Sequence, residues 1–577
     1  MVWSTHILYT PTQRTRGRDD WDGCRAQPSF RPPLTSRRPE SSPAQPQAAG
    51  LGCCALLSAA PGLAPPEGHP GHGRLKASPS AVRQRGRGPG RLRPRAVRAG
   101  RAAFRSPAEQ THTLCPASSP LGACVQVSAP KWFPAEFAFH VTHTCPGTST
   151  QQCPSVLSPV GQFWHVSDLH LDPTYHITPD RTKVCSSSKG ANASNPGPFG
   201  DFLCDSPYQL ILSAFSFMKN SKEEVSFMIW TGDSPPHVPV NELSTKLVIS
   251  IIGNLSSTIR NFFPDLQVFP ALGNHDYWPQ DQFPVTTSEV YNAVADFWKP
   301  WLSDEAINTF RKGGFYTQLF ESSNSHQPLR IISLNTNLYY SPNKVTVNIT
   351  DPANQFAWLE EILETSSQKK EKVYIIGHVP VGYLPYARNT TAIREYYNER
   401  LVKIFRKYSS VIAGQFFGHT HRDSIMVLLD EEEKPVNSLF VAPAVTPVKS
   451  VVQMESNNPG VRLYQYDLFD YSLLDLWQFY LDLRDANQKN ESNWKLEYIL
   501  TKTYGIEDLK PESLYEMARQ LSMPHSTLFE QYYSNYIVSY DKTILCEEGC
   551  KTCQICAIQY LDYSSYTDCI NQEAMWR

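Results

Sequence analysis

The sequence predicts an α/β layered fold over residues 159–455, on the basis of two observations. First, short runs rich in β-branched and aromatic residues recur along this part of the chain, and each run leads into a polar turn that contains His, Asp or Asn. Second, segments with apolar residues at helical spacing lie between these runs. Strands that alternate with helices indicate layers of helices packed on sheets. The polar turns would then meet at one edge, where loops carry chemistry.

The elements are expected in a fixed order. Strand-like runs occupy 162–170, 225–233, 266–276, 372–380 and 411–421, and helices are expected at 207–219, 242–263, 354–365 and 391–408. The first helix follows Ser206 and Pro207, which suit an N-cap and a first-turn proline. Beyond about residue 456 the pattern changes. Tyr, Leu and Trp recur at helical spacing in YSLLDLWQFYLDLRDANQ (471–488) and PESLYEMARQLSM (511–523), which predicts a smaller, mainly helical region over 456–577.

Residues 1–158 differ from the rest of the chain in composition. Arg, Pro, Gly and Ser dominate, and up to Arg98 there are sixteen Lys or Arg against five Asp or Glu. Such a segment buries too little apolar surface to offset the entropy of ordering it, so we expect a disordered leader or a gene-model artefact. A basic arm for nucleic acid is the alternative. The formal charge of the whole chain is −2, which does not predict a stable nucleic-acid partner.

Cysteines and sequons point to an oxidising compartment. Seven cysteines follow residue 160, and five Asn-x-Ser/Thr sequons stand at Asn192, Asn254, Asn348, Asn389 and Asn490. Disulfides and N-glycans are typical of secreted, extracellular or lysosomal proteins, which is the localisation we expect. The first residues do not show the apolar core of a signal peptide. No stretch reaches about 18 apolar residues, so we expect no transmembrane segment.

Polar residues at the ends of the strand-like runs have the pattern of a binuclear metal site. They stand in Asp168-Leu-His170, Gly232-Asp233, Gly273-Asn274-His275-Asp276, Gly377-His378 and Gly418-His419-Thr-His421. Two Asp, one Asn and four His are nitrogen and oxygen donors that suit Zn²⁺, Mn²⁺ or Fe rather than a thiolate-based structural zinc site. Two ions about 3.5–4 Å apart need a bridging carboxylate. A lone histidine is usually an ordinary surface or core residue, but five ordered motifs together predict a metal centre.

The order of these motifs resembles the calcineurin-like metallophosphoesterase superfamily from about residue 162 to residue 450. More narrowly, FWHVSDLHLDP, WTGDSPPH, ALGNHDYWP and GQFFGHTHRDS look like the acid sphingomyelinase-like phosphodiesterases. This resemblance continues to the C-terminal cysteines and does not extend into residues 1–158. It implies a β-sandwich flanked by helices, with a small, mainly helical C-terminal region that contains disulfides.

The resemblance also implies how the metal ligands divide between two Zn²⁺ or similar divalent ions. One ion would be held by Asp168, His170 and His421. The other would be held by Asn274, His378 and His419. Asp233 would bridge the two ions, and a hydroxide shared by them would attack phosphorus in line.

Two further histidines and three aromatic residues complete the implied site. His275 would bind phosphate and protonate the leaving group, and His237 would assist it. An ordinary loop histidine is the alternative for His237. Tyr277, Trp278 and Tyr383 are candidates for stacking on a base, although each is equally explained as packing within a loop.

The C-terminal cysteines could bind zinc or form disulfides. The sequons favour disulfides over a metal site. The resemblance implies the pairs Cys185–Cys204, Cys546–Cys550 and Cys556–Cys569. Cys553 is then left over as a candidate free thiol.

The expected function is hydrolysis of soluble phosphodiesters or nucleotide polyphosphates by a monomeric, zinc-dependent enzyme. The resemblance implies nucleoside triphosphates, CDP-alcohols and cyclic dinucleotides as substrates. Acid sphingomyelinase itself carries a saposin-like module ahead of its catalytic domain, and residues 1–158 lack the helical periodicity of such a module, so sphingomyelin is the alternative substrate. A non-catalytic glycoprotein that keeps the fold is a further alternative, but such a protein would be expected to have lost ligands, and here all seven are present.

Overall fold

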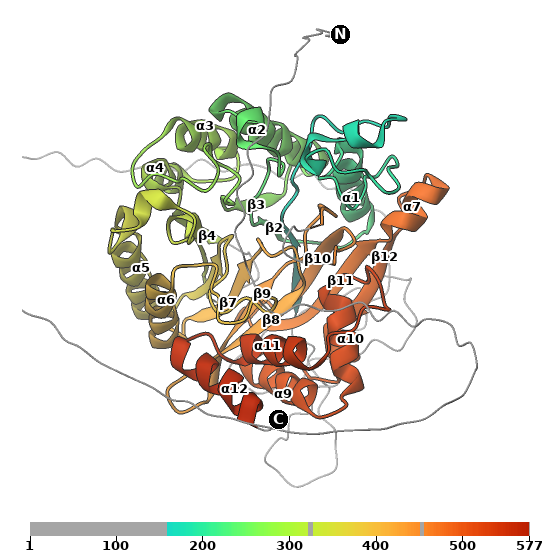
Figure 1. Ribbon diagram of the computed structural model, residues 1–577. Coiled ribbons are helices and arrows are strands. Elements are labelled where there is room, and N and C mark those ends of the chain that lie inside the picture. The colour runs from blue at the N-terminus through green and yellow to red at the C-terminus, as the bar shows by residue number, and fades with distance from the viewer. Residues whose placement is uncertain (1–158, 321–326, 450–454, 576–577) are drawn as a thin grey trace, which may run out of the picture. The chain divides into compact units, whose positions relative to one another are not determined.

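The computed structural model describes residues 159–577 apart from 321–326, 450–454 and 576–577. The expected leader over residues 1–158 lies outside this part of the chain. Two six-stranded sheets form the centre, with the orders β12-β11-β10-β1-β2-β3 and β4-β5-β6-β7-β9-β8 (Figure 1). The strands are β1 Val160–Val166, β2 Phe227–Trp230, β3 Gln267–Pro270, β4 Tyr316–Phe320, β5 Leu329–Ser333, β6 Lys372–Ile376, β7 Ile412–Phe417, β8 Ser424–Leu429, β9 Pro435–Val441, β10 Gly460–Asp467, β11 Leu473–Leu481 and β12 Trp494–Ile499.

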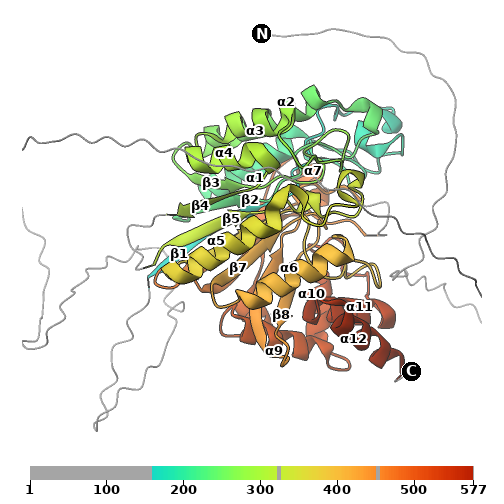
Figure 2. The same cartoon turned by 90° about the vertical axis from the view of Figure 1, so that its left-hand side faces the viewer.

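Helices cover both outer faces of the two sheets. In Figure 2, α2, α3 and α4 lie on one side of the strands, and α9 to α12 lie on the other. The α-helices are α1 Tyr208–Asn220, α2 Thr245–Phe262, α3 Glu289–Trp298, α4 Asp304–Gly313, α5 Gln355–Lys369, α6 Glu395–Lys407, α7 Leu483–Lys489, α8 Leu500–Tyr504, α9 Pro511–Ser522, α10 Thr527–Tyr536, α11 Glu548–Gln559 and α12 Tyr563–Met575. The short 3-10 helices are η1 Arg181–Lys183, η2 Ser186–Ser188, η3 Val240–Glu242, η4 Thr336–Leu338, η5 Lys344–Thr346 and η6 Pro352–Asn354.

An aromatic core joins the two sheets face to face. Phe163 on β1 stacks on Phe227 of β2, with ring centroids 4.7 Å apart, and on Tyr464 of β10, at 4.9 Å. From the opposite sheet, the ring of Phe416 on β7 meets Phe163 edge-on at 5.4 Å. Large rings fill the space between two sheets with few side chains, and edge-to-face pairs add specificity to the packing. The β-sandwich expected from the family resemblance is confirmed.

Parallel pairing brings several strand ends to one edge of the sandwich. In the first sheet β1, β2 and β3 pair in parallel, and in the second β5, β6, β7 and β9 do so. The carboxyl ends of parallel strands share one edge of a sheet, so the loops after β1, β2, β3, β6 and β7 can converge. These are the five strand ends at which the sequence predicts polar residues.

Four of the expected helices are present with small shifts at their ends. They correspond to α1, α2, α5 and α6. Helix α1 begins at Tyr208, and its N-cap is Pro207 rather than Ser206, because Pro207 has extended backbone angles with ψ at 152°. Helices α3 and α4 and strands β4, β5, β8 and β9 were not expected. Each of these two helices begins with a serine cap, at Ser288 and Ser303, that accepts a backbone hydrogen bond.

The helix expected over 471–488 is wrong for its first part, which forms β11. Both faces of β11 are covered by hydrophobic side chains. Leu476 packs between the two sheets, whereas Trp477 and Phe479 pack toward the outer helices. A strand that is covered on both faces loses the alternation of apolar and polar residues by which strands are recognised. Strands β10, β11 and β12 extend the sheet that contains β1, and the helical part of the C-terminal region follows β12.

The C-terminal region contains two of the implied disulfides, Cys546–Cys550 and Cys556–Cys569. Cys553, between them on α11, is buried and is itself disulfide-bonded, so the expectation of a free thiol there is wrong. Among the described helices, none combines the length and apolar composition that crossing a membrane requires.

Candidate metal centre

Seven side chains from five loops meet at one edge of the sandwich. The loops follow β1, β2 and β3 in one sheet and β6 and β7 in the other. Ligand atoms gather there within 4.8 Å of one another in groups that include Asp168 with His170 and His421, and Asp233 with His378 and His419. The side chain of Asn274 joins the second group. The structure thus brings together the residues that the sequence predicts as ligands.

The first group consists of Asp168, His170 and His421. Nε2 of His421 lies 3.2 Å from Nε2 of His170 and 3.5 Å from Oδ1 of Asp168. Nδ1 of His170 lies 2.7 Å from the carbonyl oxygen of Pro235, and it must donate because a carbonyl has no proton. Nε2 of a neutral His170 therefore turns its lone pair toward the group. A metal-ligating histidine is typically fixed in this way through its other nitrogen.

The second group consists of Asn274, His378 and His419 around Asp233. Nε2 of His378 lies 3.0 Å from Oδ2 of Asp233 and 3.0 Å from Oδ1 of Asn274. Nδ1 of His419 lies 2.9 Å from the same amide oxygen. Oδ2 of Asp233 is also 3.4 Å from Nε2 of His170 in the first group. One carboxylate oxygen therefore lies between the two groups, where a bridging ligand is needed.

The donor atoms of these groups fit divalent cations. Nδ1 of His378 donates to the carbonyl of Thr231 over 2.7 Å, so Nε2 of a neutral His378 would face two oxygens, lone pair against lone pair. Burial lowers the pKa of His378, but the charge of Asp233 and its hydrogen bond raise it to about 9. Burial disfavours ionised Asp233, yet His378 and His275 hold its pKa well below the usual range. The site thus attracts positive charge, which metal ions can supply in place of protons.

Five of the seven residues have backbone angles in the left-handed region. The φ values are 52° at Asp168, 36° at His170, 58° at Asp233, 74° at His419 and 62° at His421. Residues other than glycine seldom adopt positive φ, and such strain concentrates at functional sites. Backbone hydrogen bonds between loops hold two of them, since the N–H of Asp168 donates to Gly232 and that of His170 donates to Asp233, each over 3.0 Å.

Two glycines allow the loops to approach this closely. A Cβ at Gly273 would lie 2.1 Å from Oδ1 of Asp233, and a Cβ at Gly418 would lie 2.0 Å from Oγ of Ser167. A methyl group at Gly273 would also lie 2.3 Å from the backbone nitrogen of Asp233, and one at Gly418 would displace the side chains of Ser167 and Asp168. The glycines beside the candidate ligands therefore have the steric role that the sequence predicts.

The two candidate acids, His275 and His237, lie beside the first group. The ring centroid of His237 is 4.1 Å from that of His170 and 4.3 Å from that of His275. The backbone N–H of His275 donates to Oδ1 of Asp233 over 2.8 Å. Nδ1 of His275 is buried and has no hydrogen-bond partner among the described residues. Burial and the neighbouring His237 hold the pKa of His275 well below its ordinary value.

Two buried aspartates support these loops without having been assigned from the sequence. Asp205 accepts a hydrogen bond from the backbone N–H of His237 at 2.6 Å and lies 3.1 Å from Nδ1 of its ring. Asp276 accepts three backbone N–H groups at 2.7–2.9 Å from the loops after β2 and β3, which ties those loops together. Asp276 belongs to the recognised Gly-Asn-His-Asp motif. No sequence pattern connects Asp205 to His237, 32 residues away.

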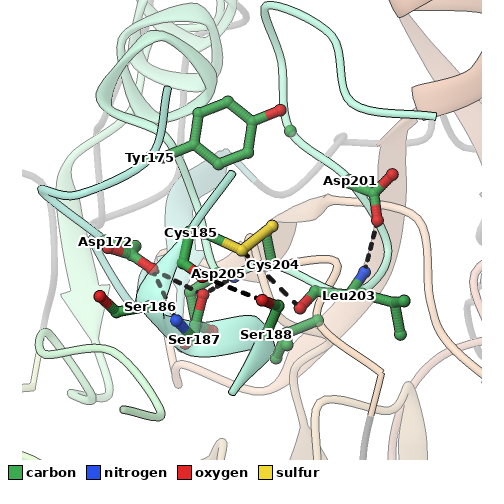
Figure 3. Close-up of a disulfide and its surroundings, with 12 residues drawn as sticks. Asp172, Tyr175, Cys185, Ser186, Ser187, Ser188, Asp201, Leu203, Cys204 and Asp205 are labelled. Carbon is green, nitrogen blue, oxygen red and sulfur yellow. Dashed lines mark hydrogen bonds between the residues drawn. A yellow bond between two sulfur atoms is a disulfide. The ribbon is translucent and has the colours of Figure 1, made fainter. Parts of the chain in front are cut away.

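A disulfide holds the segment that carries Asp205. Cys185 and Cys204 are bonded, as the resemblance implies, and the bond lies next to a small polar network (Figure 3). Oγ of Ser187 donates to Asp172 over 2.6 Å and accepts the backbone N–H of Asp205 at 2.8 Å. The cross-link therefore fixes the aspartate that in turn fixes His237.

The three aromatic candidates for base stacking differ in their surroundings. Tyr383 is only 2% exposed, and its ring stacks on Tyr566 of α12 with centroids 3.7 Å apart. One face of its ring is therefore already used in packing. Tyr277 and Trp278 are partly buried, and Tyr277 packs against other rings. A further ring that the sequence analysis missed, Tyr340, lies edge-on to His419 at 4.9 Å.

Comparisons with known proteins agree with this geometry. Residues 161–423 match the calcineurin-like phosphoesterase family, and residues 434–576 match the acid sphingomyelin phosphodiesterase C-terminal region. The human protein named cyclic GMP-AMP phosphodiesterase SMPDL3A is 69% identical over 413 residues, which cover 72% of this chain and 90% of that protein. Human acid sphingomyelinase-like phosphodiesterase 3b is 42% identical over 413 residues, which cover 71% and 90% of the two chains.

A solved structure, that of the calcineurin-like phosphoesterase YfkN from Bacillus subtilis, covers 63% of this chain and 97% of its own, with 10% identity and a TM-score of 0.29. The sequence relatives carry the assignment, since they are similar along most of their own length. They confirm the resemblance on which the expected fold rests. The chain therefore belongs to the calcineurin-like phosphoesterase family, as a metal-dependent phosphoric diester hydrolase.

Proposed function

We propose that the site holds two zinc ions that share Asp233. Asp168, His170 and His421 would hold one, and Asn274, His378 and His419 the other. The observation that carries this proposal is the position of Oδ2 of Asp233, 3.4 Å from Nε2 of His170 and 3.0 Å from Nε2 of His378. The nitrogen and oxygen donor set suits zinc, and all seven residues come from loops whose backbone is fixed by neighbouring loops.

Bound ions would supply positive charge to the phosphoryl oxygens and lower the pKa of a water molecule that attacks phosphorus. The protein's own residues would do the remaining work. His275 would give a proton to the leaving group, in keeping with a buried Nδ1 that has no partner within the described residues. Asp205 would hold His237 against the same phosphate, since it contacts both the backbone and the ring of that histidine.

We propose soluble phosphodiesters of nucleotides as the substrate class, with cyclic dinucleotides first, then CDP-alcohols and nucleoside triphosphates. The name of the relatives with 65–69% identity, cyclic GMP-AMP phosphodiesterase, supports this order. Trp278 and Tyr340 supply partly buried rings near the metal loops on which a base could stack. Sphingomyelin is the second candidate, supported by the match of the C-terminal region.

We further propose that the protein is monomeric and is glycosylated in the secretory pathway, for secretion or for the lysosome. The disulfides Cys185–Cys204, Cys546–Cys550 and Cys556–Cys569 support an oxidising compartment. The asparagines of all five sequons are exposed, as glycosylation requires, at Asn192, Asn254, Asn348, Asn389 and Asn490.

A substrate panel tests the proposed function. The purified full chain, with its metal content measured, would be given cyclic GMP-AMP, CDP-choline, ATP and sphingomyelin vesicles under identical conditions. We expect the highest kcat/KM on a nucleotide substrate and two zinc ions per chain. Higher kcat/KM on sphingomyelin would support the second candidate, and one ion per chain at full activity would refute the binuclear mechanism. Inactivity on all four substrates with both ions bound would contradict the substrate class.

A further inference from the structure

A histidine is buried between the two sheets, away from the loops that form the metal centre. His165 lies on β1, is fully buried, and meets the rings of Phe416 and Tyr464 at centroid distances of 5.9 and 6.2 Å. Its Nδ1 has no hydrogen-bond partner among the described residues. Burying a polar group in apolar surroundings is unfavourable, and a phenyl ring would fill the space without that cost. Packing alone therefore does not explain a histidine at this position.

A chain of three hydrogen bonds leads from His165 to the metal centre. Nε2 of His165 lies 3.0 Å from Oγ1 of Thr231, Oγ1 of Thr231 lies 2.7 Å from Oγ of Ser167, and Oγ of Ser167 lies 2.5 Å from Oδ2 of Asp168. The last acceptor is a carboxylate, so Ser167 must donate to it. The single proton of Thr231 must then go to Ser167, and His165 must donate through Nε2.

The direction of these three hydrogen bonds is therefore fixed by the groups that form them. Nε2 of His165 carries a proton in only one neutral tautomer and in the cation. Arg462 on β10 lies directly opposite His165 in the sheet, and its positive charge disfavours the cation. Burial and the charge of Arg462 hold the pKa of His165 well below its ordinary value, so the ring is neutral with its proton on Nε2. All three bonds point the same way, and hydrogen bonds aligned in series strengthen one another.

The chain of hydrogen bonds also helps to set how the carboxylate of Asp168 is turned, together with the backbone N–H of His419, which lies 3.2 Å from Oδ1 and 3.1 Å from Oδ2. Its Oδ2 is occupied by Ser167, whereas its Oδ1 faces Nε2 of His421 at 3.5 Å and Nε2 of His170 at 3.7 Å. Rotation of this carboxylate would break the bond to Ser167 and turn Oδ1 away from the first group. We propose that His165, acting through Thr231 and Ser167, is a positioning residue that holds Oδ1 of Asp168 toward the ion of the first group.

This inference rests on the proposed metal centre and goes beyond it, because it assigns metal affinity to a residue of the inter-sheet core. Groups that orient metal ligands typically change affinity by about 10- to 100-fold when they are removed. His165 acts through two intermediates, so we expect the lower end. Its loss should weaken binding at the first group about tenfold and leave the second group unchanged.

The test compares metal retention in variants of the purified full chain. His165→Phe keeps an aromatic ring but removes the donor, Thr231→Val removes the middle hydroxyl, and His165→Gln keeps an N–H that can reach Thr231. Phe163→Leu disturbs the same core on the same strand without touching the chain of hydrogen bonds. Zinc per chain would be measured against increasing concentrations of a competing chelator, and thermal unfolding would be followed for each variant.

We expect His165→Phe and Thr231→Val to lose one of two zinc ions at about tenfold lower chelator concentration than wild type. His165→Gln should retain it, and Phe163→Leu should lower the melting temperature while holding both ions. Adding His165→Phe to Ser167→Ala should cost little more than Ser167→Ala alone, because His165 acts only through Ser167. Wild-type retention of both ions by a folded His165→Phe would overturn the inference, as would equal loss of zinc in Phe163→Leu. Absence of zinc from the wild-type protein would instead refute the proposed function.

Discussion

Replacing His275 with alanine should separate proton transfer from metal binding. The backbone N–H of residue 275 would still donate to Oδ1 of Asp233, and the neighbouring Asn274, not His275, contacts the second group. We therefore expect His275→Ala to fold and to bind as many ions as the wild type. What the variant loses is a buried imidazole whose Nδ1 has no partner among the described residues.

The expected loss of kcat is about 10²–10⁴-fold, the usual contribution of a positioned general acid. The structure favours the lower part of this range, because the ring of His237 lies 4.3 Å from that of His275 and could supply some of the missing proton. A hundredfold loss corresponds to about 2.7 kcal/mol of transition-state stabilisation. His525→Ala, which removes an exposed histidine from the loop between α9 and α10, serves as the matched control and should leave kcat unchanged.

The assay compares two leaving groups and measures metal content beside both rates. A nitrophenolate leaves without a proton, so a nitrophenyl phosphodiester should lose less rate in His275→Ala than a substrate whose leaving group is a sugar alkoxide. Loss of zinc from the variant would make His275 a ligand and refute the assignment. An equal rate loss for both leaving groups, with both ions retained, would make it a phosphate-binding residue and not an acid.

Three further changes test other parts of the structure. Asp205→Asn should lower kcat/KM about 10- to 100-fold at unchanged zinc content, because a charged hydrogen-bond partner of His237 is worth about 1.5–3 kcal/mol; an unchanged kcat/KM would refute this. Gly273→Ala should lose zinc, since its Cβ would lie 2.1 Å from Oδ1 of Asp233, and zinc analysis showing two ions would contradict the steric argument. Burial raises the pKa of Glu497 well above its ordinary value, so the carboxyl destabilises the fold progressively as pH rises above about 4.5. Glu497→Gln should therefore melt higher than wild type at pH 7.5 and equally at pH 4, and a difference that is the same at both pH values would exclude this cause.

The strand ends of the sandwich were predictable, because two signals coincide there. A run of β-branched and aromatic residues predicts each strand, and the His, Asp or Asn that follows it has no reason to be buried unless it binds something. Since β1, β2 and β3 are parallel, their carboxyl ends must share an edge, and the motifs after them meet without further assumptions. Strand β11 was not predicted, because both of its faces pack against hydrophobic clusters. Its sequence therefore lacks the alternation of apolar and polar residues by which a strand is recognised.

The residues that support the candidate ligands were harder to predict from the sequence than the candidate ligands were. Asp205 reaches His237 only because a disulfide and the hydroxyl of Ser187 fix its segment, and such a contact follows from tertiary structure alone. The surroundings of Tyr383, a candidate for base stacking that loop packing explains equally well, also follow from tertiary structure. It stands seven residues after the end of β6, in the loop that also carries His378, but α12 packs Tyr566 onto its ring from the far end of the chain.

The positive φ angles of the candidate ligands are the feature of the site that is least favourable for the residue types in the sequence. Positive φ costs a residue other than glycine about 1–2 kcal/mol, so the five candidate ligands with positive φ cost about 5–10 kcal/mol. That sum approaches the whole net stability of a typical domain, about 5–15 kcal/mol. No single loop could offset this cost alone. Hydrogen bonds between loops offset it: Asp168 and His170 donate to the loop after β2, and Asp276 accepts three backbone N–H groups. The strained conformations are therefore a property of loops bound to one another, and the metal centre exists only when the two sheets have already brought those loops together.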